Sequence, residues 1–487
     1  MASAYVSLQR RNDRDENQKS EETRRKMVGT LTDTHCASIA QVKITQFRDG
    51  LDGQGIAPGD SQYESARRIW NASVDKKPGL IVQCESSDDV VKAIKFARAN
   101  DIQVAVRGGG HNVGGRALCD NGLVIDMSRM RKIDVDAEAR TVTAQAGCTL
   151  GDLDAATHPH GLVVPAGIFT KTGIAGLTLG GGVGWLVRKY GLTCDNVLSF
   201  EVVSADGKVV TASADENDDL FWGLRGGGGN FGVVLTFTYR AHPLTTVLGG
   251  LLVHPQSRAG EVLRFYRDFM DGAPDELTAY AVMLHTPDGD PVAAIVPCWC
   301  GDLDEGEKYL QPLREFGPPL VDAVKTVPFP QMQSLFDDAF PDGNQNYWKS
   351  TFVKQLSDEA IDVLVEHANT MPSPLTAVVV ELYGGAMARV GSGETAFGHR
   401  TSDYDIGILS QWTDTADTEK NVAWTRSLYD ALQPHASGAF RLNFLDQEDD
   451  AVIRASFGSN YDRLAALKRK YDPENFFRQN QNIRPAP

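Results

Sequence analysis

The chain has 487 residues and a formal net charge of −16. This length is sufficient for two or three domains with large hydrophobic cores. The negative charge argues against a nucleic-acid partner, because phosphate binding needs an excess of Lys and Arg, and the absence of any run of eighteen apolar residues argues against a membrane span.

The first 40 residues are rich in charged and amide side chains, and we expect them to form a mobile tail. Arg24-Arg25 is not followed by an apolar run, so neither a signal peptide nor a twin-arginine signal is predicted. The seven cysteines form no CxxC pair, which indicates reduced thiols and a cytoplasmic location.

Between residues 76 and 246 the sequence predicts a mixture of helices and strands. Ser87–Ala99 has a cap and helical spacing of its apolar residues, and Leu150–Thr157 is a second predicted helix. Short apolar or alternating runs predict strands at 78–84, 102–106, 123–126, 133–136, 141–146 and 232–240.

The pattern changes from about Thr245, where the glycine clusters of the first half end. Strands are predicted at 277–284, 292–300 and 377–383, and helices at 259–270 and 359–371. This order favours a separate α+β domain with an antiparallel sheet. A basic helix is expected from Tyr461 onward.

Three glycine clusters are the most informative feature of the sequence. They lie at 107–112, 173–185 and 225–232, and none of them fits the Rossmann or the Walker pattern. In regular structure, glycine lowers stability by about 0.5–1 kcal/mol relative to alanine. The large number of glycines in one domain therefore suggests that a large ligand lies against the backbone. Bare N–H groups bind phosphate well, which makes a pyrophosphate dinucleotide the natural candidate, and His111 offers a nucleophilic imidazole beside it.

Several runs then resemble the berberine bridge enzyme-like oxidoreductases of the vanillyl-alcohol oxidase and p-cresol methylhydroxylase superfamily, especially 6-hydroxy-D-nicotine oxidase-like and enterocin-flavoenzyme-like members. The matching runs are at 107–112, 179–186, 189–196, 219–234 and 471–483. The resemblance implies an α+β fold with a two-part FAD-binding domain of the p-cresol methylhydroxylase type at 41–246 (core 76–246). A substrate-binding α+β domain with an antiparallel sheet would follow at 247–440, and 441–487 would return to the FAD domain.

The resemblance also implies that His111 is bonded covalently to the 8α-methyl group of FAD, as an 8α-histidyl flavin. The loops around it would bind the rest of the cofactor. The FAD-binding residues expected from the matching motifs are Arg107, Gly108, Gly109, Gly110, Asn112, Thr172, Gly173, Gly176, Gly180, Gly182, Asn230, Gly232, Val233, Asn480 and Gln481.

Many relatives form a second flavin bond through a cysteine in a Gly-x-Cys-x-x-x-Gly run. This chain reads Gly167-Ile-Phe-Thr-Lys-Thr-Gly173, with Phe169 in place of the cysteine. We therefore expect one covalent bond and no cysteinyl bond. Thr172 is expected to face the N5 edge of the flavin, where oxygen must arrive. No metal site is expected, because His158 and His160 lack partners at ligand spacing.

Candidate catalytic residues come from the second half of the chain. Strand alternation puts Glu381 and Tyr383 on one face, and similar segments lie over the flavin in relatives, as does the segment with Tyr404. A tyrosine of lowered pKa would be a plausible base, although both residues also fit an ordinary sheet. Many relatives carry a Tyr-Tyr-Gly run where this chain has Ser456-Phe-Gly458, so mechanisms that need that phenol are in doubt.

The resemblance predicts an FAD-linked oxidase acting on a small organic molecule. Hydride would pass from a C–H beside OH or NH to the flavin N5, and O2 would reoxidise the flavin and give H2O2. Alternatives are a monooxygenase that uses oxygen bound at flavin N5, a dehydrogenase that avoids O2, and a flavin-binding protein without catalysis. The sequence leaves the substrate and the oligomeric state open.

Overall fold

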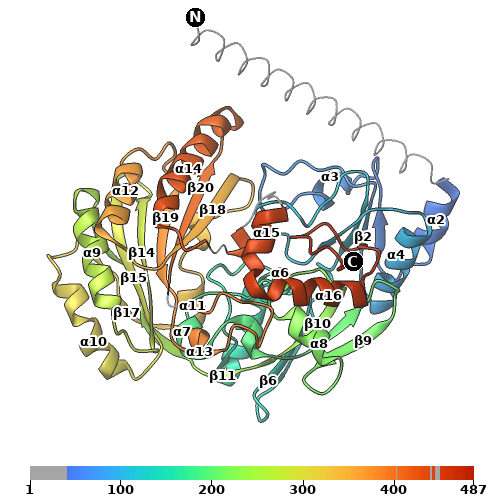
Figure 1. The fold of residues 1–487 in the computed structure, drawn as a ribbon, viewed down its shortest axis with the longest axis horizontal. Helices are drawn as coiled ribbons and strands as arrows, with labels where there is room; N and C mark the ends of the chain where they lie inside the picture. The colour runs from blue at the N-terminus through green and yellow to red at the C-terminus, as the bar shows by residue number, and fades with distance from the viewer. Residues whose placement is uncertain (1–40, 402, 439–440, 445–449) are drawn as a thin grey trace, which may run out of the picture.

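The fold is built on hydrogen-bonded β-sheets. A computed structural model describes residues 41–401, 403–438, 441–444 and 450–487. Figure 1 shows two lobes, one built on a large sheet and the other combining the N-terminal half with helices from the C-terminal end. The tail predicted at 1–40 lies outside the described residues.

The first sheet is mostly parallel and has the order β1-β2-β4-β3. All four residues of β4 are buried, which is the pattern expected for a parallel strand covered on both faces. Ser86 caps α4 by accepting a hydrogen bond from the Asp89 amide. The elements of this part are β1 (Gln54–Ile56), β2 (Leu80–Gln83), β3 (Val104–Arg107), β4 (Leu123–Asp126), α2 (Gln41–Asp49), α3 (Tyr63–Ala66) and α4 (Ser87–Ala99).

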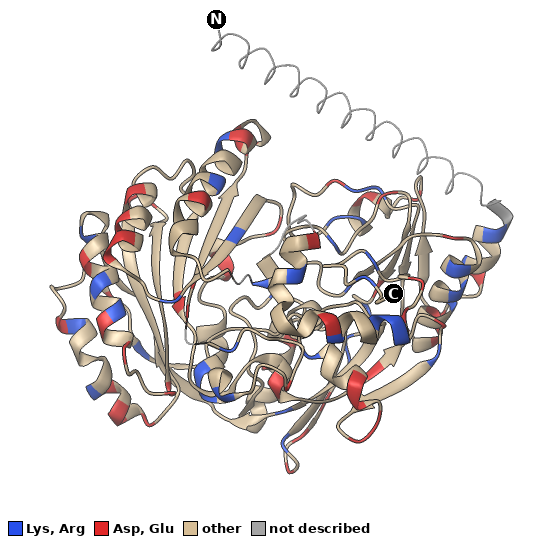
Figure 2. Cartoon of the chain, in the orientation of Figure 1, with Lys and Arg blue, Asp and Glu red and all other residues tan. Residues whose placement is uncertain are grey.

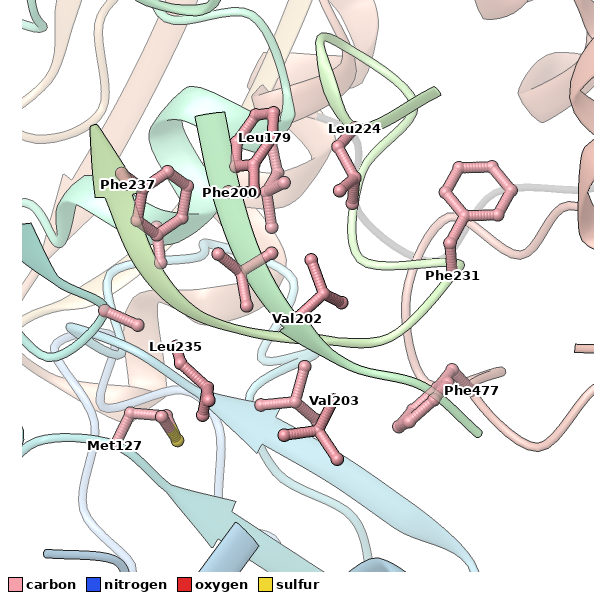
Figure 3. Packing of buried hydrophobic residues seen from close by; sticks show 14 of the residues in the cluster. Met127, Leu179, Phe200, Val202, Val203, Leu224, Phe231, Leu235, Phe237 and Phe477 are labelled. Carbon is pink, nitrogen blue, oxygen red and sulfur yellow. The ribbon is translucent and has the colours of Figure 1, made fainter. Parts of the chain in front are cut away.

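A second, antiparallel sheet follows, with the order β5-β6-β10-β8-β9. Its inner face carries Phe200, Val202 and Phe237, which Figure 3 shows packed together in the core. The strands are β5 (Ile133–Asp136), β6 (Thr141–Gln145), β8 (Val197–Val203), β9 (Val209–Ser213) and β10 (Val233–Arg240). The helices beside them are α5 (Leu150–Thr157), α6 (Ile174–Leu179), α7 (Val187–Tyr190) and α8 (Asp218–Leu224), and β7 (Leu162–Val163) pairs with β11 (His242–Pro243).

The C-terminal end of the chain packs on this same core. Leu464 and Leu467 of α16 and the following Phe477 and Ile483 belong to the cluster that contains Phe200 and the other residues of the second sheet. The helices are α15 (Asp450–Phe457) and α16 (Tyr461–Tyr471). The end of the chain therefore lies next to the segments that carry the glycine clusters.

The large sheet is antiparallel throughout and has the order β16-β13-β15-β14-β19-β20-β18, with β12 and β17 paired beside β15. Its strands are β12 (Thr246–Gly249), β13 (Leu252–Pro255), β14 (Leu277–His285), β15 (Pro291–Trp299), β16 (Val321–Asp322), β17 (Lys325–Pro328), β18 (Gln345–Val353), β19 (Ala377–Leu382) and β20 (Tyr404–Trp412). Its helices are α9 (Ala259–Met270), α10 (Leu303–Glu315), α11 (Phe329–Gln333), α12 (Asp358–Ala368), α13 (Ala386–Arg389) and α14 (Thr418–Leu432).

Strand alternation divides the side chains of this sheet between two faces. On β19, Val378, Val380 and Leu382 enter the core beneath α9, α10, α12 and α14, which cover the face turned away from the other lobe (Figure 1). Val379 and Glu381 point the opposite way, toward a cavity. The α+β class predicted from the sequence is confirmed.

Charged residues of both signs are spread over the outer helices, and few lie along the central strands in the view of Figure 2. Within the described residues, no helix combines the length and the apolar character needed to cross a bilayer.

Candidate active site

A long cavity runs between the two lobes. One wall consists of backbone from the glycine-rich segments and from residues 477–481, and the other consists of side chains on the inner face of the large sheet. The first lobe contributes one charged residue to the lining, Arg116, whereas the large sheet contributes Glu381 and Asp405. Arg441, from the segment after the sheet, lies beside these two carboxyl groups.

The first glycine cluster begins where β3 ends, at the carboxyl end of a parallel strand. Gly109 packs directly on Gly173, since a Cβ atom built on Gly109 would lie 2.5 Å from the Gly173 Cα. Gly110 has a φ of +69°, a conformation that favours glycine. Cβ atoms at Gly176 or Gly229 would meet nothing within 4 Å, and both residues line the cavity. The glycines thus bring two backbone segments together and leave space beside them.

His111 lies on the cavity wall between two aromatic rings. Its imidazole stacks on Trp70, with ring centroids 4.3 Å apart, and the Phe169 ring is 6.0 Å away. Burial lowers the pKa of His111 to about 4. The imidazole is therefore neutral at physiological pH, the state in which a ring nitrogen can act as a nucleophile.

The third glycine cluster is connected to the C-terminal segment by amide side chains. The Asn480 side chain donates to the Gly229 carbonyl at 2.8 Å, and the Asn230 side chain donates to the Gln481 carbonyl at 3.1 Å. Gln481 in turn donates to the Leu442 carbonyl at 3.1 Å. These bonds connect segments of the cavity lining that are distant in sequence.

The structure brings most of the predicted cofactor residues to this cavity. The cavity-lining residues among them are Gly108, Gly109, Gly110, His111, Asn112, Thr172, Gly173, Gly176, Gly180, Gly232, Val233, Asn480 and Gln481. Arg107, Gly182 and Asn230 are not part of the lining. Arg107 donates to the Ala66 carbonyl at 2.7 Å, so it supports the loop from behind.

On the opposite wall, polar side chains form one cross-strand row. Glu381 of β19 is paired with Tyr280 of β14 on one side and with Asp405 of β20 on the other. Arg441 Nη1 donates to Asp405 Oδ2 at 3.0 Å and lies 3.7 Å from Glu381 Oε2. All four residues line the cavity.

Both carboxyl side chains of this row are buried: that of Glu381 is 4% exposed and that of Asp405 is 2% exposed. Burial raises the pKa of Glu381 to about 8, against the opposing effect of Arg441, and burial also raises the pKa of Asp405. A carboxyl group with a pKa near the working pH is suited to proton transfer.

The structure does not bring the two predicted tyrosines to the cavity. Neighbouring residues of β20 face opposite sides of the sheet, and Asp405 faces the cavity. Tyr404 therefore faces the other side, where it packs near Tyr266 in the core under the helices. Tyr383 lies past the end of β19 in a separate apolar cluster, and its hydroxyl donates to Asp405 at 3.4 Å. Burial raises the pKa of Tyr404 to about 12 and that of Tyr383 well above its usual value, the opposite of the lowering expected of a base.

Sequence reasoning missed Tyr280, Asp405 and Arg441 in the polar row, and Trp348 elsewhere in the cavity lining. Had the cavity-facing side of β20 been assigned correctly, Asp405 would have been chosen as a candidate in place of Tyr404. That assignment needs the pairing of β14, β19 and β20, which is not visible in a single sequence. Arg441 lies outside the strands, and no local signal places it here.

The residues present fit FAD. The glycines supply a backbone wall without side chains, a neutral imidazole lies within it, and carboxyl groups face it from the other lobe. The described residues contain no group of His, Cys, Asp and Glu side chains arranged to hold a metal ion.

The chain is similar in sequence and structure to known proteins over most of its length. The family described as FAD binding domain matches residues 78–213, and the family described as berberine and berberine-like matches residues 442–484. The chain is 34% identical to an FAD-linked oxidoreductase of Dictyostelium discoideum, over 91% of this chain and 97% of that protein. It is 31% identical to (R)-6-hydroxynicotine oxidase of Paenarthrobacter nicotinovorans, over 89% and 97% of the two chains. The crystal structure of 6-hydroxy-D-nicotine oxidase from Arthrobacter nicotinovorans superposes with a TM-score of 0.83 at 30% identity, covering 90% of this chain and 99% of that one.

Proposed function

The chain belongs to the berberine bridge enzyme-like family of FAD-linked oxidoreductases, and from that premise we propose that it is an oxidase of a small organic molecule with FAD bonded covalently to His111. FAD, when bound, supplies the redox chemistry, because it takes up hydride at N5 from a C–H beside OH or NH and passes two electrons to O2, giving H2O2. As part of the proposal, residues 41–246 and 441–487 bind FAD and residues 247–440 bind the substrate.

The position and charge state of His111 carry this proposal. The imidazole lies on the cavity wall at the end of the first glycine segment, stacked on Trp70. Burial keeps it neutral, so a ring nitrogen has a free lone pair that would bond to the 8α-methyl carbon of FAD. That bond would replace a C–H bond of the methyl group, with its proton lost and its two electrons passed through the flavin to O2. No cysteinyl bond is proposed, because Phe169 presents a phenyl ring 6.0 Å from the imidazole where relatives carry a thiol.

Glu381 is the proposed proton acceptor. It lies on the wall opposite the glycine segments, and its pKa of about 8 lets it lose and regain a proton near neutral pH. Arg441, 3.7 Å from Glu381, stabilises the ionised form that accepts the proton.

Acid precipitation of the purified protein tests the covalent bond. We expect a yellow pellet whose polypeptide has gained the mass of one FAD, and we expect His111→Ala to release its flavin into the supernatant. His160→Ala, an exposed histidine in the same lobe, serves as the matched control and should behave like the unaltered protein. A colourless pellet from the unaltered protein, or a yellow one from His111→Ala, would contradict the proposal.

A further inference from the structure

Five aromatic side chains form a closed ring of contacts where the two lobes meet. His111 contacts Trp70 and Phe169. Trp70 also contacts Trp348, and Phe340 contacts both Phe169 and Trp348. The first three residues come from the first lobe, whereas Phe340 and Trp348 come from the lobe of the large sheet. The imidazole proposed to bind FAD is therefore part of an aromatic cluster that only the two lobes together complete.

Trp70 makes the closer of the two ring contacts to His111. The ring centroids are 4.3 Å apart and the ring planes differ by 14°, so the rings lie face to face. Phe169 is further away, with its centroid at 6.0 Å. A histidine ring turns about a terminal torsion that has only broad preferences of its own, so the plane of the imidazole is fixed by what packs against it. The face of the Trp70 ring is the nearest group that does so.

Trp70 is itself held by both lobes. It is buried, and its indole N–H donates to the Phe340 carbonyl at 3.1 Å, while the Gly343 amide donates to the Trp70 carbonyl at 3.2 Å. On the other side, the Trp70 amide donates to the carbonyl of Gly110, the residue before His111, at 3.3 Å. Turning the Trp70 ring would therefore break a hydrogen bond to the lobe of the large sheet.

Asn71 extends this connection between the lobes. Its side chain donates to the Val113 carbonyl at 2.7 Å in the first lobe and to the Asn346 carbonyl at 3.0 Å on β18. It also accepts a hydrogen bond from the Asn346 amide at 2.9 Å. Asn71 is buried, and a buried polar group whose hydrogen bonds are satisfied in one arrangement helps to specify that arrangement. Residues 70 and 71 thus form a bridge between the loop that carries His111 and an edge strand of the large sheet.

We propose that Trp70 is a positioning residue for the covalent attachment of FAD, and that its ring holds the His111 imidazole in the plane from which a ring nitrogen reaches the 8α-methyl carbon. This inference rests on the proposed function, because it concerns the same bond. In that step a C–N bond forms while one methyl C–H bond and the imidazole N–H bond break. The two protons leave with two electrons, which pass through the flavin to O2 and give H2O2.

The orientation of the imidazole matters because such a step needs the reacting atoms aligned at about 3–3.5 Å, and a misplacement of about 1 Å can slow a reaction about a hundredfold. An imidazole free to turn about its own torsion would spend little time with a nitrogen lone pair directed at the methyl carbon. A ring stacked on its face removes that freedom before FAD arrives.

Trp222 is a matched tryptophan without this contact. Like Trp70, it is 4% exposed and lies in the first lobe, and its indole N–H donates to a backbone carbonyl, that of Gly393, at 2.8 Å. Its ring lies against the Arg463 guanidinium group, 3.7 Å from the ring centroid. The two tryptophans therefore have similar burial and similar hydrogen bonding, and they differ in the imidazole that stacks on Trp70.

The test measures how fast the bond forms in full-length apoprotein, prepared from flavin-starved cells and incubated with FAD in air. Acid-stable flavin is followed over time and divided by the total flavin that stays with the protein on gel filtration. We expect Trp70→Leu to bind FAD but to form the bond about tenfold to a hundredfold more slowly than the unaltered protein. Trp70→Phe also lacks the indole N–H but restores a ring face, so its rate should be within about threefold of the unaltered rate. Trp222→Leu is the control and should form the bond at the unaltered rate.

The ratio of acid-stable to total flavin separates positioning from stability, because a variant that merely folds badly loses both together. Parallel loss of both in Trp70→Leu, or equal rates for Trp70→Leu and the unaltered protein, would overturn the inference. A Trp70→Phe protein as slow as Trp70→Leu would also overturn it, because the ring face would then not be what orients His111. Failure of the proposed function is seen separately, as unaltered protein that binds FAD but gives a colourless acid pellet.

Discussion

Lys468 forms a buried ion pair at the point where the C-terminal segment meets the cavity. The side chains of Lys468 and Asp472 are both 0% exposed, and Lys468 Nζ donates to Asp472 Oδ2 at 2.6 Å. It also donates to the carbonyl of Asn230 at 2.7 Å and to that of Phe477 at 2.8 Å. One ammonium group therefore connects α16, the third glycine cluster and the segment that ends in Gln481.

Replacing Lys468 by Met keeps an unbranched chain of similar length and removes the charge. Loss of one partner of a buried ion pair typically costs about 3–5 kcal/mol, because the other charge is left uncompensated. Asp472 would still accept hydrogen bonds from the amides of Phe476 and Phe477, both at 2.8 Å. These bonds partly satisfy the carboxylate, so we expect a loss near the lower end of that range, about 3 kcal/mol.

Lys470→Met provides a matched control two residues along the same helix. Lys470 pairs with Asp219 at 2.6 Å, but its side chain is 59% exposed, and exposed pairs contribute about 0–1 kcal/mol. Urea unfolding followed by tryptophan fluorescence would measure both variants, and the flavin content of each purified protein would report on the cavity. The prediction is refuted if the free energy of unfolding of Lys468→Met is within about 1 kcal/mol of that of Lys470→Met and its flavin content is full.

Three further predictions concern the cavity and its surroundings. Phe169→Cys combined with His111→Ala should restore the acid-stable yellow pellet that His111→Ala alone lacks, since both side chains face the same cavity 6.0 Å apart; a colourless pellet would exclude a flavin within reach of position 169. Gly109→Ala should lower stability by about 1–3 kcal/mol and reduce flavin content, because the new Cβ would lie 2.5 Å from the Gly173 Cα; unchanged urea midpoints would contradict this. Asp154→Asn should flatten the pH dependence of stability. Burial raises the pKa of Asp154 from 3.8 to about 8, so the folded state retains a proton that the unfolded state has lost. The stability of the unaltered protein therefore falls as pH rises from about 4 to about 8. Urea midpoints at pH 5 and pH 8 would measure this, and equal slopes for the two proteins would refute it.

Much of the first lobe could be predicted from local sequence. The helix expected at Ser87–Ala99 and the strand expected at Leu123–Asp126 have these bounds in the structure. Both are specified by neighbouring residues, through a serine cap in one case and a continuous apolar run in the other. The predicted family and FAD-binding domain are confirmed by the similarity of the whole chain to known members.

The cavity wall formed by the large sheet could not be predicted in the same way. Tyr404 and Asp405 are adjacent in the sequence, yet one enters the core beneath the helices and the other faces the cavity. Which of them takes which side depends on the register of β20 against β19 and β18, where Asp405 is placed opposite Glu381 and Phe352.

By itself, the sequence determined the family, the cofactor class and the glycine segments with His111, because those features depend on residue types at short and fixed spacing. The tertiary structure decided the polar row and its arginine. Glu381, Asp405 and Arg441 come from separate segments, and their contact, their burial and the raised carboxyl pKa values arise only when long-range strand pairing excludes water from between them.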